Sequence, residues 1–178
     1  MIVGLCGKKF SGKSACAKYL VKTRGYERIG FAKPIKDFMY ALGLTWSQVE
    51  GDEKETPCAL LGGKSPRFAM QTLGTEWGRD TINSDLWIRS WMARSAPYPN
   101  IVADDVRFGN EIDAIRSAGG VLIEVVTPIA RRVQFGAVTA NDGHSSETVP
   151  DGIEYTIYND GSLEDLYDSL DTVITKHG

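Results

Sequence analysis

Residues 7–14, with the sequence GKKFSGKS, limit the possible folds of this chain more than any other segment. They match the pattern G-x-x-x-x-G-K-[ST], in which the backbone N–H groups of a glycine-containing loop surround a polyphosphate. Residues 1–6 are apolar and are predicted to form a buried strand, and residues 14–22 are predicted to form a helix. Together the three segments predict a nucleotide-binding P-loop; the alternative is a glycine-lysine turn that binds nothing.

The residue types in this loop suit a triphosphate. Gly7 and Gly12 let the backbone curl around the anion, and the positive end of the following helix dipole points at the same place. Lys13 is expected to reach the β- and γ-phosphates, and the hydroxyl of Ser14 to ligate Mg²⁺. The other residues of this segment expected to contact ATP are Lys9, Ser11 and Ala15.

The composition is that of an ordinary globular protein. The chain has 178 residues, 42% apolar and 24% charged, so we expect one domain with a substantial core. The formal net charge of −3 gives no general basic surface for nucleic acid or an anionic membrane. The sequence has no apolar run long enough for a transmembrane helix, and its first segment is predicted to be a core strand rather than a signal peptide. Three cysteines without metal-ligand spacing and only two histidines favour a cytoplasmic protein with reduced thiols and no zinc site.

Strand-like and helix-like segments alternate after the loop, which predicts an α/β fold with a parallel sheet between layers of helices. Ligands should then bind at the carboxyl ends of the strands, where the P-loop lies. Ser162 and Asp165 fit a capping box at the start of the last helix. Further strands are predicted at 27–31, 100–105, 121–126 and 155–158, and helices at 34–42, 45–49, 66–77, 84–97, 110–118 and from 162 onward.

The helical stretch between the second and third strands is longer than a minimal crossover requires. Within it, residues 78–80 are expected to break or bend a helix, and residues 51–65 to form a surface loop. Residues 127–150 form another long polar segment, and such length is typical of a functional lid. The side chains expected to face inward are Phe68, Met70, Leu73 and Trp77, then Leu86, Ile88, Trp91 and Met92, then Ile112 and Ile115, and finally Leu163, Leu166, Leu170 and Val173.

The third predicted strand ends in two carboxylates, Asp104 and Asp105. An apolar strand that ends in aspartate, downstream of a P-loop, is typical of the acid that holds Mg²⁺ directly or through water. Asp105 is predicted for this role, and the adjacent Asp104 leaves open which of the two serves the metal. The alternative is a structural one, since aspartate is common at strand ends.

Five arginines away from the P-loop help to choose between functions. A small kinase must bind a second anion opposite ATP and must exclude water, since otherwise it hydrolyses ATP. Guanidinium groups suit this task because their fork binds phosphate oxygens in pairs. Each arginine could instead be a surface charge or an ion-pair partner of Glu76, Asp80 or Glu111. The five are Arg67 and Arg79 beside the inserted helix, Arg107 after the third strand, and Arg131 and Arg132 at the start of the predicted lid.

Several segments, in order along nearly the whole chain, resemble the deoxynucleoside monophosphate kinases of tailed bacteriophages. The P-loop alone is shared by many families, whereas segments 71–79 and 105–111 are much more specific. The loop residues 8–10 and the segment 131–144 depart from the family pattern. The other similar segments are FAKPIK at 31–36, KSPR at 64–67, DLW at 85–87, H-x-S-E at 144–147 and NDGSL at 159–163.

The resemblance implies a single domain with the three-layer P-loop nucleoside monophosphate kinase fold. Its central parallel sheet would have about five strands, with core residues 1–31, 100–126 and 153–178. A helical NMP-binding insertion would span about 32–99, and a lid about 127–150. The implied reaction is ATP-dependent, in-line phosphorylation of deoxynucleoside 5′-monophosphates to diphosphates for phage DNA synthesis, in the host cytoplasm, by a monomer or a homodimer.

On the same basis the site residues have expected roles. Arg67 and Arg79 would grip the acceptor phosphate, with Arg107 near the transfer path and Arg131 and Arg132 closing over the transferring group. No strong base is needed, because the transition state is loose and catalysis rests on positioning and electrostatics. The other residues expected at the acceptor are Phe31, Lys36, Gln71, Trp87 and Asp105, and Asn159 and Gly161 are expected to border the adenine.

Two rival functions remain at this point. One is a P-loop kinase with another small acceptor, such as dephospho-coenzyme A or a nucleoside. The other is a non-catalytic or ATPase module in which nucleotide controls partner binding. The dispersed arginines and the helical insertion argue against the second. An assay across acceptors would distinguish the first from a deoxynucleoside monophosphate kinase.

Overall fold

The computed structural model describes residues 1–129 and 152–177. The chain divides into two compact units. The sheet unit comprises Met1–Gly30 and Arg94–Gly178, and the insertion unit comprises Phe31–Ala93.

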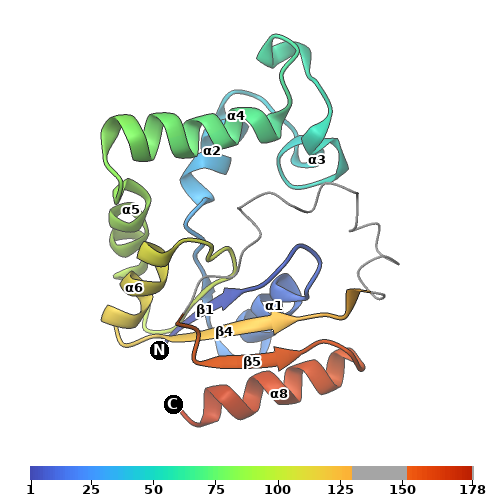
Figure 1. Cartoon of the computed structure of the whole chain (residues 1–178), viewed down its shortest axis with the longest axis vertical. Helices are drawn as coiled ribbons and strands as arrows, with labels where there is room; N and C mark the ends of the chain where they lie inside the picture. The colour runs from blue at the N-terminus through green and yellow to red at the C-terminus, as the bar shows by residue number, and fades with distance from the viewer. Residues whose placement is uncertain (130–151, 178) are drawn as a thin grey trace. The chain divides into compact units, whose positions relative to one another are not determined.

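The sheet unit is built on a five-stranded sheet in which all neighbouring strands are parallel, as predicted. The order is β2-β3-β1-β4-β5, so the strand before the P-loop is central. Figure 1 shows β1, β4 and β5 in this sheet. Its Val3 pairs with Val102 on one side and Val121 on the other. The strands are β1 Ile2–Cys6, β2 Glu27–Arg28, β3 Ile101–Ala103, β4 Val121–Val126 and β5 Tyr155–Tyr158.

β2 is shorter than the predicted strand at 27–31. After Arg28, the Ile29 N–H still donates to the Val102 oxygen at 3.0 Å, and the chain then leaves the sheet. β2 is an edge strand with one neighbour, and that neighbour, β3, is itself only three residues long. Pairing therefore ends where β3 ends.

Helices cover both faces of the sheet, which gives the predicted three layers. They are α1 Lys13–Arg24, α6 Gly109–Ser117 and α8 Leu163–Thr175. α1 and α8 share one face through a core that contains Leu20, Leu166 and Leu170. On the other face Gly4 of β1 meets Ile115 of α6, and a Cβ on Gly4 would lie 2.7 Å from the Ile115 Cδ1. Burial of this apolar surface is the main favourable contribution to folding.

The last helix begins as its sequence predicts. The Ser162 hydroxyl accepts a hydrogen bond from the Asp165 N–H at 3.1 Å, and the Asp165 carboxylate accepts one from the Ser162 N–H at 2.7 Å. This capping box satisfies N–H groups that have no partner inside the helix. Leu163 is about half exposed because it lies in the first turn, whereas the rest of the predicted stripe is buried, namely Leu166, Leu170 and Val173.

The insertion unit consists of short helices around a small core of Met39, Leu44 and Val49. The segment 51–65, predicted to be a surface loop, contains two short 3₁₀ turns. No helix in the described part of the chain is long and apolar enough to cross a membrane. The elements of the unit are α2 Lys33–Ala41, α3 Trp46–Val49, η1 Asp52–Glu55, η2 Ala59–Leu61, α4 Pro66–Thr72, η3 Leu73–Ile82 and α5 Leu86–Ser95, of which the last ends beyond the unit's boundary.

Residues 78–80, which were expected to break or bend a helix, do not break it. Helical backbone continues through η3 in π form, the wider helix with i→i+5 hydrogen bonds. A spacing of 3.6 residues therefore no longer identifies its buried side. Gly74 and Gly78 are buried, whereas Trp77, which was expected to face inward, is 48% exposed. Gly78 lies under the ring of Trp87, where a Cβ would come within 2.5 Å.

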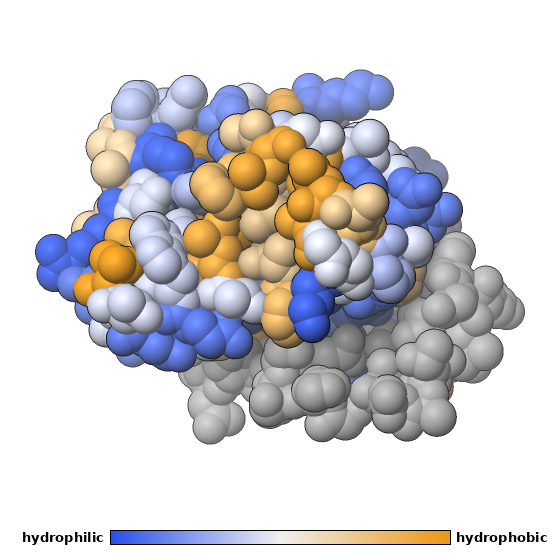
Figure 2. Space-filling model, turned by 90° about the horizontal axis from the view of Figure 1, so that it is seen from above, coloured by the Kyte–Doolittle hydropathy of each residue, from blue (hydrophilic) through white to orange (hydrophobic). Residues whose placement is uncertain are grey.

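Several large apolar side chains of the insertion unit are exposed. Phe68 and Met92, both predicted to face inward, are half exposed. The Lys64 ammonium lies 5.3 Å from the centre of the Phe68 ring, a favourable place for a cation. Figure 2 shows apolar residues gathered on the face of the molecule seen from above.

Candidate active site

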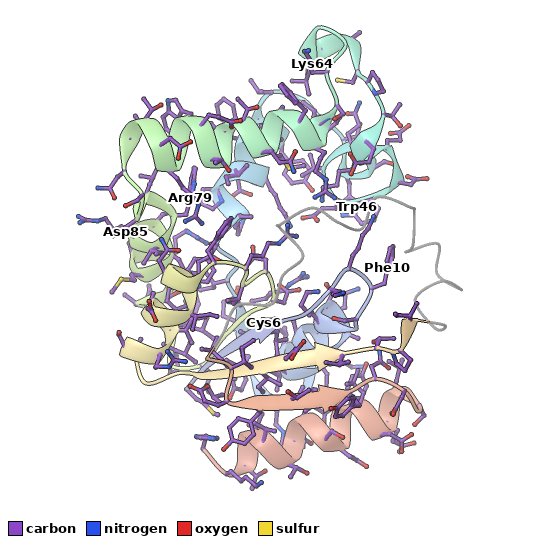
Figure 3. The ribbon with its side chains drawn as sticks, in the orientation of Figure 1. Cys6, Phe10, Trp46, Lys64, Arg79 and Asp85 are labelled. Carbon is purple, nitrogen blue, oxygen red and sulfur yellow. The ribbon has the colours of Figure 1, made fainter. Side chains whose placement is uncertain are left out.

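The P-loop joins β1 to α1 with a backbone that requires glycine at two points. Gly7 has φ 133° and Gly12 has φ 109°, values that side chains rarely allow. A Cβ on Gly7 would lie 2.4 Å from the Val125 oxygen, and one on Gly12 would lie 2.7 Å from Nδ2 of Asn159. The loop is therefore held closely against the ends of β4 and β5. Phe10 has φ 63° and projects from the tip of the loop (Figure 3).

The side chain of Lys13 folds back onto the backbone of the P-loop. Its Nζ donates hydrogen bonds to the backbone oxygens of Gly7 at 2.6 Å and Lys8 at 2.7 Å. Hydrogen bonds between two charged groups are shorter and stronger than bonds to a neutral carbonyl. Lys13 can therefore exchange these carbonyls for phosphate oxygens while it stays in the loop.

The other predicted contacts of the loop differ in exposure. Ser11 is buried, and its N–H donates to the Lys8 oxygen at 3.1 Å. The side chain of Lys9 is exposed. The N–H of Ala15, in the first turn of α1, donates to the Gly12 oxygen at 2.9 Å.

One carboxylate, that of Asp104, joins Ser14 to Arg28. The Ser14 hydroxyl donates to its Oδ2 at 3.1 Å. Arg28 binds both oxygens, with Nε 2.8 Å from Oδ1 and Nη2 2.6 Å from Oδ2. Asp104 is 8% exposed, so this guanidinium balances a nearly buried charge. Asp105 is directed elsewhere: a Cβ on Gly30 would lie 2.6 Å from its Oδ2.

Arg28 was not predicted to belong to the site. β2 pairs with β3 so that Arg28 lies beside Val102. Asp104 follows Val102 by two residues and so points to the same side of the sheet. A basic residue on the strand next to an acid-ended strand is a usable signal, but the sequence does not say which strands are neighbours.

The oxygens of Ser14 and Asp104 fit Mg²⁺, which prefers hydroxyl and carboxylate oxygens. The described residues contain no group of three or more His, Cys, Asp or Glu side chains that could hold a metal alone. Mg²⁺ at this place would take its remaining ligands from water and nucleotide phosphates, as it usually does beside a P-loop.

Arg107 lies on the exposed turn between β3 and α6. The carboxylate of Glu111, which is 2% exposed, accepts the N–H of Arg107 at 2.9 Å and the N–H of Phe108 at 3.2 Å. Glu111 therefore fixes the turn that carries Arg107. The sequence had suggested Glu111 only as an ion-pair partner of an arginine.

Three basic side chains predicted to bind the acceptor lie in the insertion unit. Lys36 pairs with Glu50 at 2.8 Å, and Arg67 pairs with Glu55 at 2.8 Å. Arg79 donates to the backbone oxygen five residues later at 3.5 Å (Figure 3). The acidic partners have side chains that are 33% and 64% exposed, so water competes for both ion pairs and each contributes little to stability.

Two predicted aromatic contacts are buried inside the insertion unit. Phe31 stacks on Trp91 with ring centroids 4.8 Å apart. Trp87 donates its Nε1–H to the Gly74 oxygen at 2.7 Å, which joins α5 to η3. Of the three uncharged residues expected at the acceptor, Phe31, Gln71 and Trp87, only Gln71 has an exposed side chain.

The remaining predicted residues lie late in the chain. Asn159 follows β5, and its Nδ2 donates to the Ser11 oxygen at 3.0 Å. Gly161 lies in the exposed turn before α8. Arg131 and Arg132, with the predicted lid from 130 onward, lie outside the described residues.

The architecture is that of known small-molecule kinases. The shikimate kinase of Aquifex aeolicus superposes with a TM-score of 0.59 at 11% identity, over 99% of this chain and 97% of that one. The APS kinase of Mycobacterium tuberculosis superposes with a TM-score of 0.51 at 12% identity, over 98% of this chain and 96% of that one. At such low identity the similarity concerns the fold alone, and it confirms the predicted P-loop kinase fold.

The family is shown by sequence. A family model described as deoxynucleotide monophosphate kinase matches residues 63–170. A protein of Acanthamoeba polyphaga mimivirus assigned to these kinases is 30% identical over 190 residues, 96% of this chain and 94% of that protein. The deoxynucleotide monophosphate kinase of Enterobacteria phage T4 is 30% identical over 114 residues, 60% of this chain and 44% of that enzyme. The chain therefore belongs to the deoxynucleotide monophosphate kinase family, as its sequence motifs predicted.

Proposed function

We propose that this kinase binds Mg²⁺-ATP on its P-loop and transfers the γ-phosphoryl group in line to the 5′-phosphate of a deoxynucleoside monophosphate. One observation supports this most strongly. Directly after the P-loop lysine, the Ser14 hydroxyl lies 3.1 Å from the Asp104 carboxylate, which is nearly buried at the end of β3. Such a pair of oxygens beside a phosphate-binding loop is suited to hold the Mg²⁺ that phosphoryl transfer requires.

On the donor side, Lys13 and the loop N–H groups would hold the phosphates. Ser14 and Asp104 would hold Mg²⁺, which when bound neutralises charge on the phosphate oxygens. Asn159 and Gly161 are proposed near the adenine. The reaction needs no strong base, because stabilisation of charge and alignment of the two nucleotides account for most of the catalysis.

On the acceptor side, Arg67 and Arg79, with Lys36, would bind the monophosphate. Lys36 and Arg67 are now paired with exposed glutamates, and a phosphate dianion is a stronger partner for either cation than an exposed carboxylate. Arg107, Arg131 and Arg132 are proposed to neutralise charge during transfer. Gln71 and Asp105 are the other proposed acceptor contacts. Phe31 and Trp87 are proposed to act at the acceptor through the packing that supports the site.

A panel of acceptors tests the proposal. ADP release is measured with ATP, Mg²⁺ and, separately, each deoxynucleoside monophosphate, the ribonucleoside monophosphates, dephospho-coenzyme A and deoxynucleosides. Stimulation by at least one deoxynucleoside monophosphate, with the diphosphate as product, is expected. Stimulation by dephospho-coenzyme A or a nucleoside instead would identify another acceptor, and slow ADP release that no acceptor stimulates would identify an ATPase.

Replacing Arg79 with alanine should raise the KM for the deoxynucleoside monophosphate about tenfold or more. The expected loss is that of a charge-assisted hydrogen bond to the acceptor phosphate. The KM for ATP should stay within about twofold of the wild-type value, because the phosphates of ATP are proposed to bind to the P-loop. Steady-state kinetics with each substrate varied in turn will measure both constants.

Arg89→Ala is the matched control, because Arg89 is an exposed arginine on α5 with no proposed role. Its kinetic constants should equal those of the wild type. Unchanged acceptor kinetics in the Arg79 variant would show that Arg79 does not bind the acceptor phosphate.

A further inference from the structure

Two side chains, the buried Thr127 and the partly buried Asn159, converge on one carbonyl of the P-loop. The backbone oxygen of Ser11 accepts a hydrogen bond from Oγ1 of Thr127 at 2.7 Å and another from Nδ2 of Asn159 at 3.0 Å. Thr127 directly follows β4, and Asn159 directly follows β5. The carbonyl is thereby held by two strand ends that are more than 110 residues away from it in sequence.

The peptide that carries this carbonyl would otherwise be free to turn over. The peptide unit is planar and trans, so its C=O and its N–H point in opposite directions. The N–H of this unit belongs to Gly12, whose φ of 109° is open to glycine alone among common residues. Glycine tolerates both orientations of the peptide, so its own conformational preference does not decide between them.

The donors are themselves fixed. The backbone N–H of Asn159 donates to the Val126 oxygen at 2.7 Å, which extends the β4–β5 pairing to the start of the turn. Thr127 is almost wholly buried. The Asn159 amide also lies so close to Gly12 that a Cβ there would be 2.7 Å from Nδ2. The glycine and the amide therefore fit one another as a pair.

We propose that Thr127 and Asn159 are positioning residues for ATP: by holding the Ser11 carbonyl they keep the Gly12 N–H turned toward the bound phosphates. This role rests on the proposed function, since it presumes that the loop binds a triphosphate. It gives Asn159 a task distinct from contact with adenine, and it gives Thr127 a task that its sequence context did not indicate. Neither side chain touches the reacting atoms in this role.

Removing both donors should weaken nucleotide binding in the folded protein. Thr127→Val and Asn159→Leu each remove a donor with little change in size. We expect each to raise the dissociation constant of a non-hydrolysable ATP analogue with Mg²⁺ about fivefold, and the double variant about thirtyfold, as the loss of one and two neutral hydrogen bonds implies. Isothermal titration calorimetry measures the constants, and the KM for the acceptor should stay within about twofold.

A second readout reports the peptide itself. In ¹⁵N-labelled protein the Gly12 amide should show exchange broadening in Thr127→Val that the wild type lacks, because a released peptide alternates between two orientations. Thr127→Ser keeps the donor and should restore both the affinity and the sharp signal. A merely structural role for Thr127 would lower thermal stability and leave these two readouts unchanged.

Thr23→Val is the matched control. Thr23 Oγ1 also donates to a backbone oxygen, that of Tyr19, at 2.7 Å, but on α1 away from the loop. Its analogue affinity should equal that of the wild type. Wild-type affinity and a sharp Gly12 signal in Thr127→Val and Asn159→Leu would overturn the inference while leaving the kinase proposal intact. Failure of the wild type to bind the analogue would instead overturn the proposed function.

Discussion

Lys13→Met is expected to lower kcat by at least about a thousandfold while the protein still folds. The ammonium is the charge that the P-loop places at the β- and γ-phosphates, and the loss of one such group in a water-poor site typically costs two to five powers of ten. In the free protein Lys13 contacts loop carbonyls, those of Gly7 and Lys8, and makes no contribution to the buried core. Methionine has a side chain of about the same length as lysine but carries no charge.

Single-turnover kinetics with saturating ATP will measure this loss, and thermal unfolding will show whether the fold survives. We expect the midpoint to move by less than about 4 °C, the shift that about 1 kcal/mol causes in a chain of this size. Lys18→Met, on the exposed side of α1, is the matched control and should retain wild-type kcat. A Lys13 variant with near-normal turnover would exclude the proposed role of the loop.

The elements that local sequence determines were predicted well. The P-loop, the strand before it and the helix after it depend on residues next to one another in the chain. The capping box at Ser162 depends on a contact between two residues that are three positions apart in the sequence. The continuous apolar run at 121–126 predicted a strand buried on both faces, and four of its six residues are fully buried. Local patterns of this kind need no knowledge of the rest of the fold.

The inserted helices were predicted less well, for a physical reason. The π-helical turn of η3 is set by contacts with another helix: Trp87 bonds to the Gly74 oxygen, and its ring occupies the space above Gly78. Glycines would ordinarily end a helix, but here Gly78 makes room for the indole ring of Trp87. Only the packing partner, thirteen residues later in the sequence, explains why the helix continues.

Site residues that act through long-range contacts could not be ranked from sequence. Asp104 and Asp105 are chemically identical, and only the direction of each side chain in the fold places one beside Ser14 and the other beside Gly30. Thr127 is the first residue of the predicted lid and lies outside the segments that resemble the family, so nothing local marked its hydroxyl. The P-loop sequence identified the ligand as a nucleotide, whereas only the tertiary structure identified the residues that orient the loop.

Asp104→Asn is expected to lower kcat about a hundredfold and to raise the Mg²⁺ concentration needed for half-maximal activity about tenfold or more. The substitution keeps the size of the side chain and removes the charge that would attract the metal. It also replaces an acceptor by an NH₂ group facing either Ser14 or Arg28, both of which donate to Asp104. Losses of this size are typical when a metal site loses charge or orientation.

The comparison with Asp105→Asn decides which carboxylate serves the metal, because the two variants make the same chemical change at adjacent positions. Binding of Mn²⁺ with ATP, followed by electron paramagnetic resonance, separates metal affinity from turnover. Asp104→Asn should weaken Mn²⁺ binding. Asp105→Asn should change the KM for the acceptor and leave Mn²⁺ binding near the wild-type value. Arg28 is 42% exposed, so water can solvate its guanidinium once the carboxylate is gone, and a large loss of stability is not expected to obscure the result. If Asp105→Asn alone weakened Mn²⁺ binding, the Ser14–Asp104–Arg28 contacts would be structural, and the metal would belong to the motif acid that the sequence first suggested.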